Sequence, residues 1–265
     1  MKGKLIGFMI IMSLLMLVGC GQGERNVLNV GMELAYPPFE MTDKDGQPAG
    51  ISVDMAHELG KFLKRPVKIW NISFDGLIPS LKTGKIDIII SSMTITEERS
   101  QSVTFSKPYS RAYLALLVSK DSSVEKVEDL NRKGRVIAVK KGTTGHLYAR
   151  EHFPLAKINV FDKESACVLE VVQKKADCFI YDQMTIFTNW QKNPDTTRAI
   201  LKPFQKDFEY WGMAMRKDDT ELHGKVDAFL EAFKESGGFD RLAEKYLKDE
   251  KETFEELGIP FFFSP

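Results

Sequence analysis

Residues 86–105 of this 265-residue chain, IDIIISSMTITEERSQSVTF, decide the fold and place a polar site beside it. Ile86–Ile90 is a short apolar run rich in β-branched residues, which is typical of a strand buried on both faces. A hydroxyl-bearing turn begins at Ser91, and Thr96 is placed to cap a short helix that opens with two glutamates. Arg99 lies in the same turn, where the helix dipole disfavours a cation. We therefore expect Arg99 to pair with Glu97 or Glu98, to point into water, or to bind an anion.

Strand-like and helix-like segments alternate along the chain. The apolar runs that predict strands are residues 28–31, 67–70, 86–90, 115–118, 136–139, 158–161, 178–181 and 212–215. The segments that predict helices are residues 53–63, 77–81, 146–152, 164–174 and 226–234. This alternation predicts an α/β architecture with largely parallel sheets, and the length is sufficient for two medium-sized domains.

Polar residues follow four of the predicted strands. In open parallel sheets, ligands bind in crevices outside the carboxyl ends of the strands. The turn 142–145, GTTG, precedes a predicted helix and can offer free backbone N–H groups to an anion, although it lacks the spacing of a P-loop. The side chains expected in one shared crevice are those of Glu33, Tyr36, Ser91, Ser92, Thr94, Lys140–Gly145 and Asp182.

The first twenty residues form a separate segment. An apolar run, Leu5–Val18, follows two lysines and is shorter than the roughly 20 residues of a membrane span. The segment resembles a bacterial lipoprotein signal peptide of residues 1–19, followed by a tether of residues 20–26. This resemblance implies lipidation of Cys20 and a location in the periplasm or on the outer face of the cell membrane.

Charge and cysteine content narrow the possible functions. The chain has 37 basic and 37 acidic residues, so its composition does not favour a nucleic-acid partner. Its four histidines show no metal-ligand spacing, and neither a metal site nor a cofactor is expected. Cys167 and Cys178 could form a disulfide in an exported chain, but their predicted places in a helix and a strand favour buried free thiols.

Six motifs occur in a fixed order. They are VGMELAYPPFE (30–40), GISVDMA (50–56), FDGLIPSLKTGKID (74–87), SSMTITEERSQSVTFSKPY (91–109), KGTT (141–144) and ADCFIYD (176–182). In these motifs the chain resembles the family 3 extracellular solute-binding proteins, which are periplasmic or lipid-anchored receptors that deliver polar amino acids to ABC importers. The resemblance extends over essentially the whole mature chain.

The resemblance implies a two-lobed periplasmic-binding-protein type II (Venus-flytrap) fold. Each lobe would contain a mostly parallel sheet flanked by helices, and two crossing strands would form the hinge. Lobe one would comprise residues 27–110 and 213–265, and lobe two residues 114–208. The hinge would lie at residues 110–113 and 209–212.

The resemblance also assigns roles to individual residues. Arg99 would form a two-pronged salt bridge with the α-carboxylate of the ligand, since a planar guanidinium suits that geometry. Asp182, from the opposite lobe, would pair with the α-ammonium group. The residues expected to assist are Gly142, Thr143 and Thr144 on the carboxylate and Ser92 and Thr94 on the ammonium group.

The ligand side chain would contact a pocket formed by Glu33, Tyr36, Phe74 and Ser91, with Phe39 as support. A carboxylate at Glu33 would attract a basic or amide side chain and repel an acidic one, which leaves arginine, lysine, histidine and glutamine as candidates. Two alternatives remain open at this stage. The aromatic residues could be ordinary core residues, and Glu33 could be a solvated surface residue.

The expected function is ligand capture for an ABC permease and ATPase encoded elsewhere, by a monomer with no catalytic activity. An enzyme of the cyclohexadienyl dehydratase type shares the implied fold and the carboxylate-binding arginine, but it would have little need for Asp182. A ligand-sensing module is a third possibility. The aromatic tail Phe261–Phe263 is expected to pack on lobe one, the alternative being an exposed contact surface.

Overall fold

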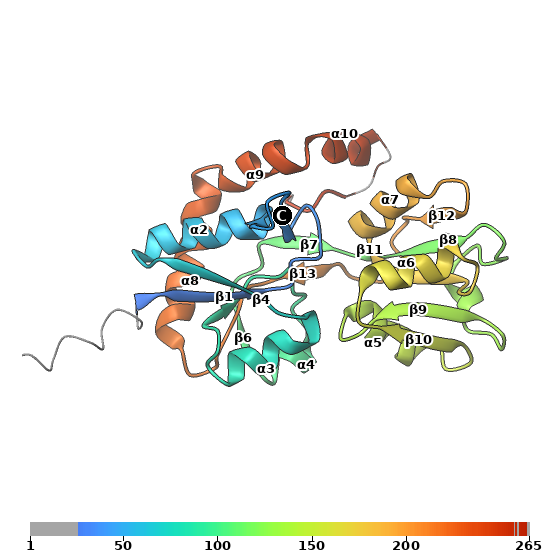
Figure 1. Cartoon of the computed structure of the whole chain (residues 1–265), viewed down its shortest axis with the longest axis horizontal. Coiled ribbons are helices and arrows are strands. Elements are labelled where there is room, and N and C mark those ends of the chain that lie inside the picture. Colours follow the sequence, from blue (N-terminus) through green and yellow to red (C-terminus); the bar gives the residue numbers. More distant parts are fainter. Residues whose placement is uncertain (1–25, 257, 259, 264–265) are drawn as a thin grey trace, which may run out of the picture.

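The computed structural model describes residues 26–256, 258 and 260–263. The predicted signal peptide and Cys20 lie outside the described residues. Two α/β units lie side by side and are joined by extended segments (Figure 1). Within the described part of the chain, no helix has the length and hydropathy needed to cross a membrane.

The first unit contains a five-stranded sheet in the order β4-β1-β5-β14-β6. Its strands are β1 (Leu28–Met32), β4 (Val67–Asn71), β5 (Ile88–Ile89), β6 (Thr104–Phe105) and β14 (Ala214–Met215). Successive side chains of β5 point to opposite faces of the sheet. Ile88 packs on the face covered by α2 (Ile51–Leu63) and α8 (Thr220–Glu235). Ile89 packs on the other face, against α3 (Leu77–Lys82). The sheet is thus buried on both faces, as the apolar run predicts.

The second unit contains a sheet in the order β10-β9-β11-β8-β12. Its strands are β8 (Leu114–Ser119), β9 (Val136–Lys140), β10 (Lys157–Phe161), β11 (Cys178–Asp182) and β12 (Thr197–Ile200). Helix α5 (Thr144–His152) packs in the core on one face, and α6 (Glu164–Val172) and α7 (Gln183–Lys192) contribute to the core on the other. The cysteine thiols lie in these cores as free, buried groups, which confirms the favoured prediction for Cys167 and Cys178.

Both sheets are mostly parallel, as predicted, because four of the five strands in each point in one direction and a single strand is reversed. The strands β4, β1 and β5 run parallel, as do β10, β9 and β11. Strands β8 and β14 pair antiparallel with β11 and β5. The outer strands β12 and β6 pair antiparallel with β8 and β14, so they point in the same direction as the parallel groups. The reason for the reversal of β8 and β14 is connectivity, because these strands follow directly from the strands that join the two units instead of from crossover helices.

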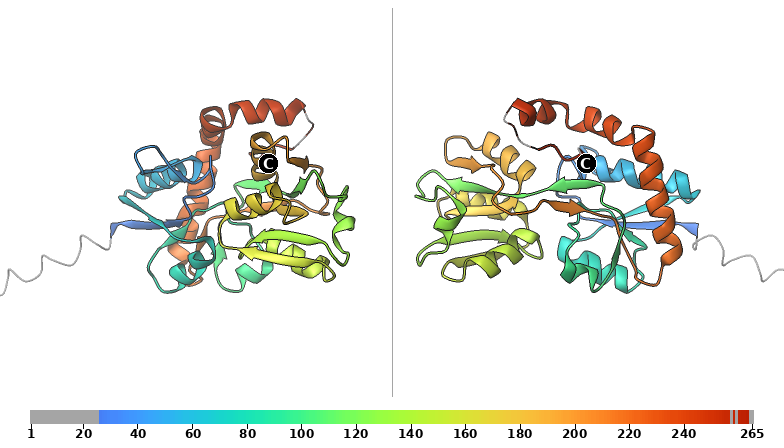
Figure 2. Two further views of the ribbon diagram at one scale, coloured as in Figure 1. Left: turned by 45° about the vertical axis from the view of Figure 1, so that its right-hand side comes forward. Right: turned by 180° about the vertical axis from the view of Figure 1, so that it is seen from behind.

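A two-stranded antiparallel ribbon of β7 (Ser110–Ala112) and β13 (Glu209–Trp211) lies between the sheets. Figure 2 shows both strands running from one unit to the other. They occupy the segments in which the sequence places the hinge. The first unit also contains four short elements: β2 (Met41–Thr42), β3 (Pro48–Ala49), η3 (Phe74–Gly76) and α4 (Glu97–Ser100). The second unit contains one, η4 (Val127–Leu130).

The C-terminal segment packs against both units. It contains α9 (Gly238–Tyr246) and α10 (Lys248–Glu256), neither of which was predicted. Phe254 of α10 is fully buried and contacts Phe187 of α7 edge-on, with ring centroids 5.4 Å apart. Phe262 packs on Phe39 in the first unit, and its carbonyl oxygen accepts a hydrogen bond from the N–H of Arg111 in β7. The prediction that the aromatic tail packs on the first lobe is therefore confirmed for Phe262.

Candidate ligand-binding site

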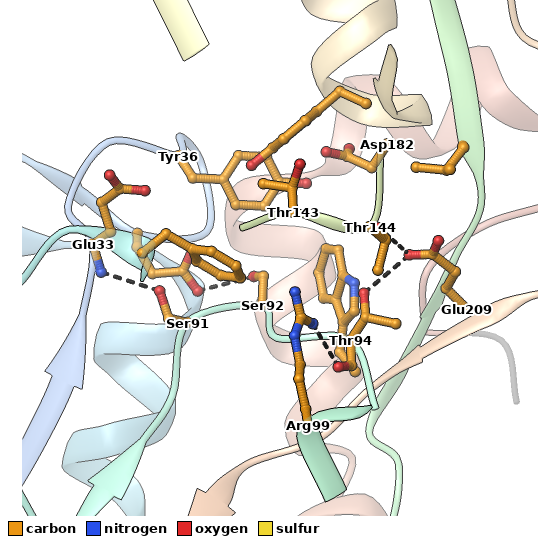
Figure 3. Close-up of a pocket in the computed structure, with 15 residues that line it drawn as sticks. Glu33, Tyr36, Ser91, Ser92, Thr94, Arg99, Thr143, Thr144, Asp182 and Glu209 are labelled. Atoms are coloured by element: carbon orange, nitrogen blue, oxygen red, sulfur yellow. Dashed lines mark hydrogen bonds between the residues drawn. The ribbon is translucent and has the colours of Figure 1, made fainter. Parts of the chain in front are cut away.

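A small cavity of about 40 Å³ lies between the two units, where β1, β5 and β11 end (Figure 3). Ten of the eleven residues predicted for the site line it, and Gly142 does not. The predicted lining residues are Glu33, Tyr36, Phe74, Ser91, Ser92, Thr94, Arg99, Thr143, Thr144 and Asp182. The residues that sequence reasoning missed are Glu40, Leu114, Tyr181, Glu209 and Trp211.

Arg99 is a buried cation that faces both units. Thr96 caps α4 by accepting a hydrogen bond from the N–H of Arg99, which fixes the backbone of this turn. The guanidinium donates to the carbonyl oxygen of Thr94 at 2.6 Å and to that of Gly142, in the second unit, at 3.0 Å. Among the described residues it forms no salt bridge with Glu97 or Glu98, so the pairing alternative is wrong. Burial lowers the pKa of Arg99, which reflects the cost of holding this charge out of water.

Asp182 has a local role that the sequence analysis did not assign to it. It ends β11 and caps α7, because its Oδ1 accepts hydrogen bonds from the N–H groups of Met184 and Thr185, both at 3.0 Å. Its Oδ2 accepts a third from the hydroxyl of Thr185 at 3.0 Å. Burial raises the pKa of Asp182, while interactions with the N–H of Thr185, the hydroxyls of Tyr36 and Thr185, and the N–H of Met184 oppose that shift. A carboxylate can accept about four hydrogen bonds, so capacity remains on the cavity side.

A buried lysine in the second unit reaches Glu33. Lys140 is the last residue of β9, its side chain is 3% exposed, and its ammonium group forms a salt bridge with Oε2 of Glu33. Glu33 is therefore not a solvated surface residue. Lys141 forms a second bridge between the units, 2.8 Å from Asp75, nearer to solvent. Because 107 residues separate Lys140 from Glu33, no local sequence signal indicates this pair.

Glu40 is fully buried beside the cavity. It accepts hydrogen bonds from the hydroxyls of Ser52 and Ser92, while its Oε2 has no hydrogen-bond partner among the described residues. Burial raises the pKa of Glu40 to about 8, although both serine hydroxyls oppose that shift. At neutral pH this carboxyl group is therefore mostly uncharged.

Replacing Glu40 with glutamine should flatten the pH dependence of stability. The folded-state pKa lies above the unfolded one, so the wild type loses stability as pH rises from about 5 to about 8, with a slope of up to about 1.4 kcal/mol per pH unit from this group. Glutamine does not titrate and lacks this contribution. Urea denaturation at several pH values measures both slopes, and parallel curves for the two proteins would contradict the assignment.

The ribbon supplies two further lining residues. Glu209 and Trp211 belong to β13, which the sequence analysis treated only as a hinge segment. Trp211 packs edge-on against Tyr36 and Phe39, with ring centroids 6.1 and 5.0 Å apart. The signal available in the sequence was the two-residue spacing of Glu209 and Trp211, which places both side chains on one face of a strand.

Within the described residues, no group of three His, Cys, Asp or Glu side chains is arranged to hold a metal ion.

Comparison with known proteins decides the family. Residues 28–249 match the model of the bacterial extracellular solute-binding proteins, family 3. The chain belongs to this family. The match covers both sheets and the ribbon between them, and it confirms the relationship expected from the six motifs.

Three similar proteins illustrate the membership. The L-arginine-binding protein of Pseudomonas aeruginosa is 32% identical over 227 residues, which cover 83% of this chain and 87% of that protein. A solved structure of an ancestral arginine-binding protein bound to arginine is 33% identical and has a TM-score of 0.78, covering 84% of this chain and 99% of that one. The ancestral amino acid-binding protein AncCDT-1, a precursor of cyclohexadienyl dehydratase, is 37% identical with a TM-score of 0.76, covering 84% and 96%. These similarities confirm the two-lobed type II fold of this family 3 protein.

Proposed function

We propose that this protein captures a free amino acid with a basic or amide side chain and delivers it to an ABC permease. One observation carries the proposal: a buried guanidinium from one unit and a buried carboxylate from the other line the same cavity. Among the described residues the guanidinium of Arg99 donates to two carbonyl oxygens and forms no salt bridge. An α-amino acid brings a carboxylate for Arg99 and an ammonium group for Asp182.

Further groups complete the contact with the amino-acid backbone. Thr143 and Thr144 begin α5, where free N–H groups favour a carboxylate. Ser92 and Thr94 offer oxygen atoms toward the ammonium group. Gly142 serves indirectly, since its carbonyl oxygen holds the guanidinium of Arg99. Burying a zwitterion is costly unless every charge finds a partner, and only a closed cleft provides partners from both units.

The proposed movement uses the two units as lobes. Lobe one would comprise residues 27–110 and 213–265, lobe two residues 114–208, and the hinge residues 110–113 and 209–212. The antiparallel ribbon of β7 and β13 supports this division, because it is the strand pair that joins the sheets. Ligand contacts made by both lobes would shift the population toward the closed state.

The pair Glu33 and Lys140 supports the proposed side-chain class. A neutral amide can accept from Lys140 and donate to Glu33, whereas a cationic side chain must share Glu33 with Lys140. An acidic side chain would meet the carboxylate of Glu33. The similarity to arginine-binding relatives supports arginine beside glutamine as a candidate; lysine and histidine belong to the same proposed set.

We further propose that the protein is exported and anchored to a membrane by a lipid. Residues 1–19 would direct export, Cys20 would carry the lipid anchor, and residues 20–26 would form the tether at the outer face of the membrane. The protein would act as a monomer without catalysis. Asp182 supports binding over dehydratase activity, because an ammonium partner has no purpose for a substrate that lacks an amino group.

Calorimetric titration of residues 26–265 against all twenty amino acids tests the proposed function. We expect micromolar binding, about −8 kcal/mol, confined to basic or amide side chains. Absence of heat with every amino acid would refute the proposal. Turnover of prephenate by the wild type would favour the dehydratase instead.

Replacing Lys140 with methionine should change ligand preference. Glu33 then loses its competing cation, so the ratio of arginine to glutamine affinity should rise about tenfold, corresponding to ~1.4 kcal/mol. Titration with the two amino acids measures the ratio. Lys141→Met is the matched control, because Lys141 pairs with Asp75, which does not line the cavity, whereas Lys140 pairs with Glu33, which does. An equal change in the ratio for both variants would remove Lys140 as the cause.

A further inference from the structure

Glu209 connects two hydroxyl groups that belong to different units. Its Oε2 accepts a hydrogen bond from the hydroxyl of Thr94 at 3.0 Å and another from that of Thr144 at 2.9 Å (Figure 3). Its Oε1 accepts a hydrogen bond from the side-chain amide of Gln205 at 3.1 Å. The amide oxygen of Gln205 accepts from the N–H of Leu114 at 2.7 Å. Three hydrogen bonds, from Thr94, Thr144 and Gln205, therefore fix the position of the Glu209 carboxylate.

These bonds determine which way the two hydroxyl protons point. A threonine hydroxyl has one proton to donate and two lone pairs with which to accept. Thr94 and Thr144 each donate that proton to Oε2 of Glu209. Both threonines also line the cavity. Toward a ligand, their oxygen atoms are left to act as acceptors.

The charge of Glu209 fits this arrangement. Burial lowers the pKa of Arg99, and the nearby negative charge of Glu209 opposes that shift. The threonine hydroxyls thus face the carboxylate of Glu209, and Asp182 adds a second carboxylate to the cavity.

We propose that Glu209 is a positioning residue that makes this site select an α-ammonium group over a hydroxyl or keto group. The inference rests on the proposed function and deepens it. An ammonium group has three protons to donate, which Asp182, Thr94 and the Ser92 carbonyl can accept. A 2-hydroxy acid has one such proton and a 2-oxo acid has none, so each leaves buried acceptors without partners at a substantial energetic cost.

Glu209→Gln tests the inference with nearly unchanged shape. The amide group can donate to one threonine, whose proton then turns toward the ligand. We expect the affinity for the α-amino acid to fall at least tenfold, while the affinity for its 2-hydroxy analogue changes less than about twofold. Calorimetry compares an amino acid with its 2-hydroxy analogue. The pair is L-arginine or L-glutamine with the corresponding 2-hydroxy acid, whichever amino acid the wild type binds more tightly.

Glu98→Gln is the matched control. Glu98 also acts electrostatically on Arg99, but it is exposed on α4 and does not line the cavity. This variant should retain the wild-type ratio between amino acid and hydroxy acid. Thr94→Val is a second test that does not depend on the folding of the Glu209 variant. Loss of the Thr94 hydroxyl should reduce the ratio of amino-acid affinity to hydroxy-acid affinity.

Three results would overturn the inference. An equal loss of affinity for both probes would show a general structural role for Glu209. Tighter binding of the amino acid to Glu209→Gln would show that Glu209 competes with the ligand carboxylate. An unchanged ratio of amino-acid to hydroxy-acid affinity in Thr94→Val would show that the Thr94 hydroxyl does not contribute to the selection of the ammonium group. Failure of the wild type to bind any amino acid would instead refute the proposed function.

Discussion

Arg99→Ala should weaken amino-acid binding by at least about 100-fold, which corresponds to ~3 kcal/mol. The α-carboxylate of the ligand would lose the one buried guanidinium in the cavity lining and remain largely unpaired in a site that excludes water. Calorimetric titration with the preferred amino acid measures the loss. The melting temperature of the ligand-free protein should change by only a few degrees, because burial of the unpaired charge is itself costly.

Arg99→Lys separates charge from geometry. Lysine keeps the positive charge but cannot form a two-pronged bond with a carboxylate, so intermediate affinity is expected. Full retention of binding in Arg99→Ala would contradict the assigned role. A large loss of ligand-free stability would identify Arg99 as mainly structural, through its bonds to Thr94 and Gly142.

Phe254→Ala should cause the largest loss of stability, about 3–5 kcal/mol. Its ring is fully buried between Phe187 of α7 and Phe262 of the tail, with ring centroids 5.4 and 6.3 Å away. Truncation would leave a cavity at the place where α10 meets the second unit. The free energy of unfolding in urea measures the effect.

Leu169→Ala is the comparison for that variant. Leu169 lies on α6 and is 51% exposed, so its truncation should cost less than about 1 kcal/mol. Similar losses for the two variants would mean that the contact between α10 and α7 contributes little. A loss below about 1 kcal/mol for Phe254→Ala would lead to the same conclusion.

The predictable part of the site lies at strand ends. Glu33, Ser91 and Asp182 follow apolar runs whose periodicity and length are visible in the sequence, and parallel strands bring their carboxyl ends to one edge. The family resemblance then pairs residues across the units. For this reason ten of the eleven predicted residues line a single cavity.

The missed residues depend on features that a local pattern does not contain. Glu209 and Trp211 enter the site because β13 passes between the sheets, and Lys140 reaches Glu33 from a strand 107 residues away. Helix α7 was missed because its cap, Asp182, was considered only as a ligand partner. The direction of β8 and β14 likewise follows from the ribbon, whose path depends on the whole chain.

Trp211 has a practical consequence. The chain contains three tryptophans, and Trp211 is the one whose side chain lines the cavity, where it is 3% exposed. Indole fluorescence responds to the polarity and packing of its surroundings, and a zwitterion placed beside this ring would alter both. The protein thus carries a native optical reporter of occupancy, with which ligand screening needs neither a dye nor a labelled amino acid.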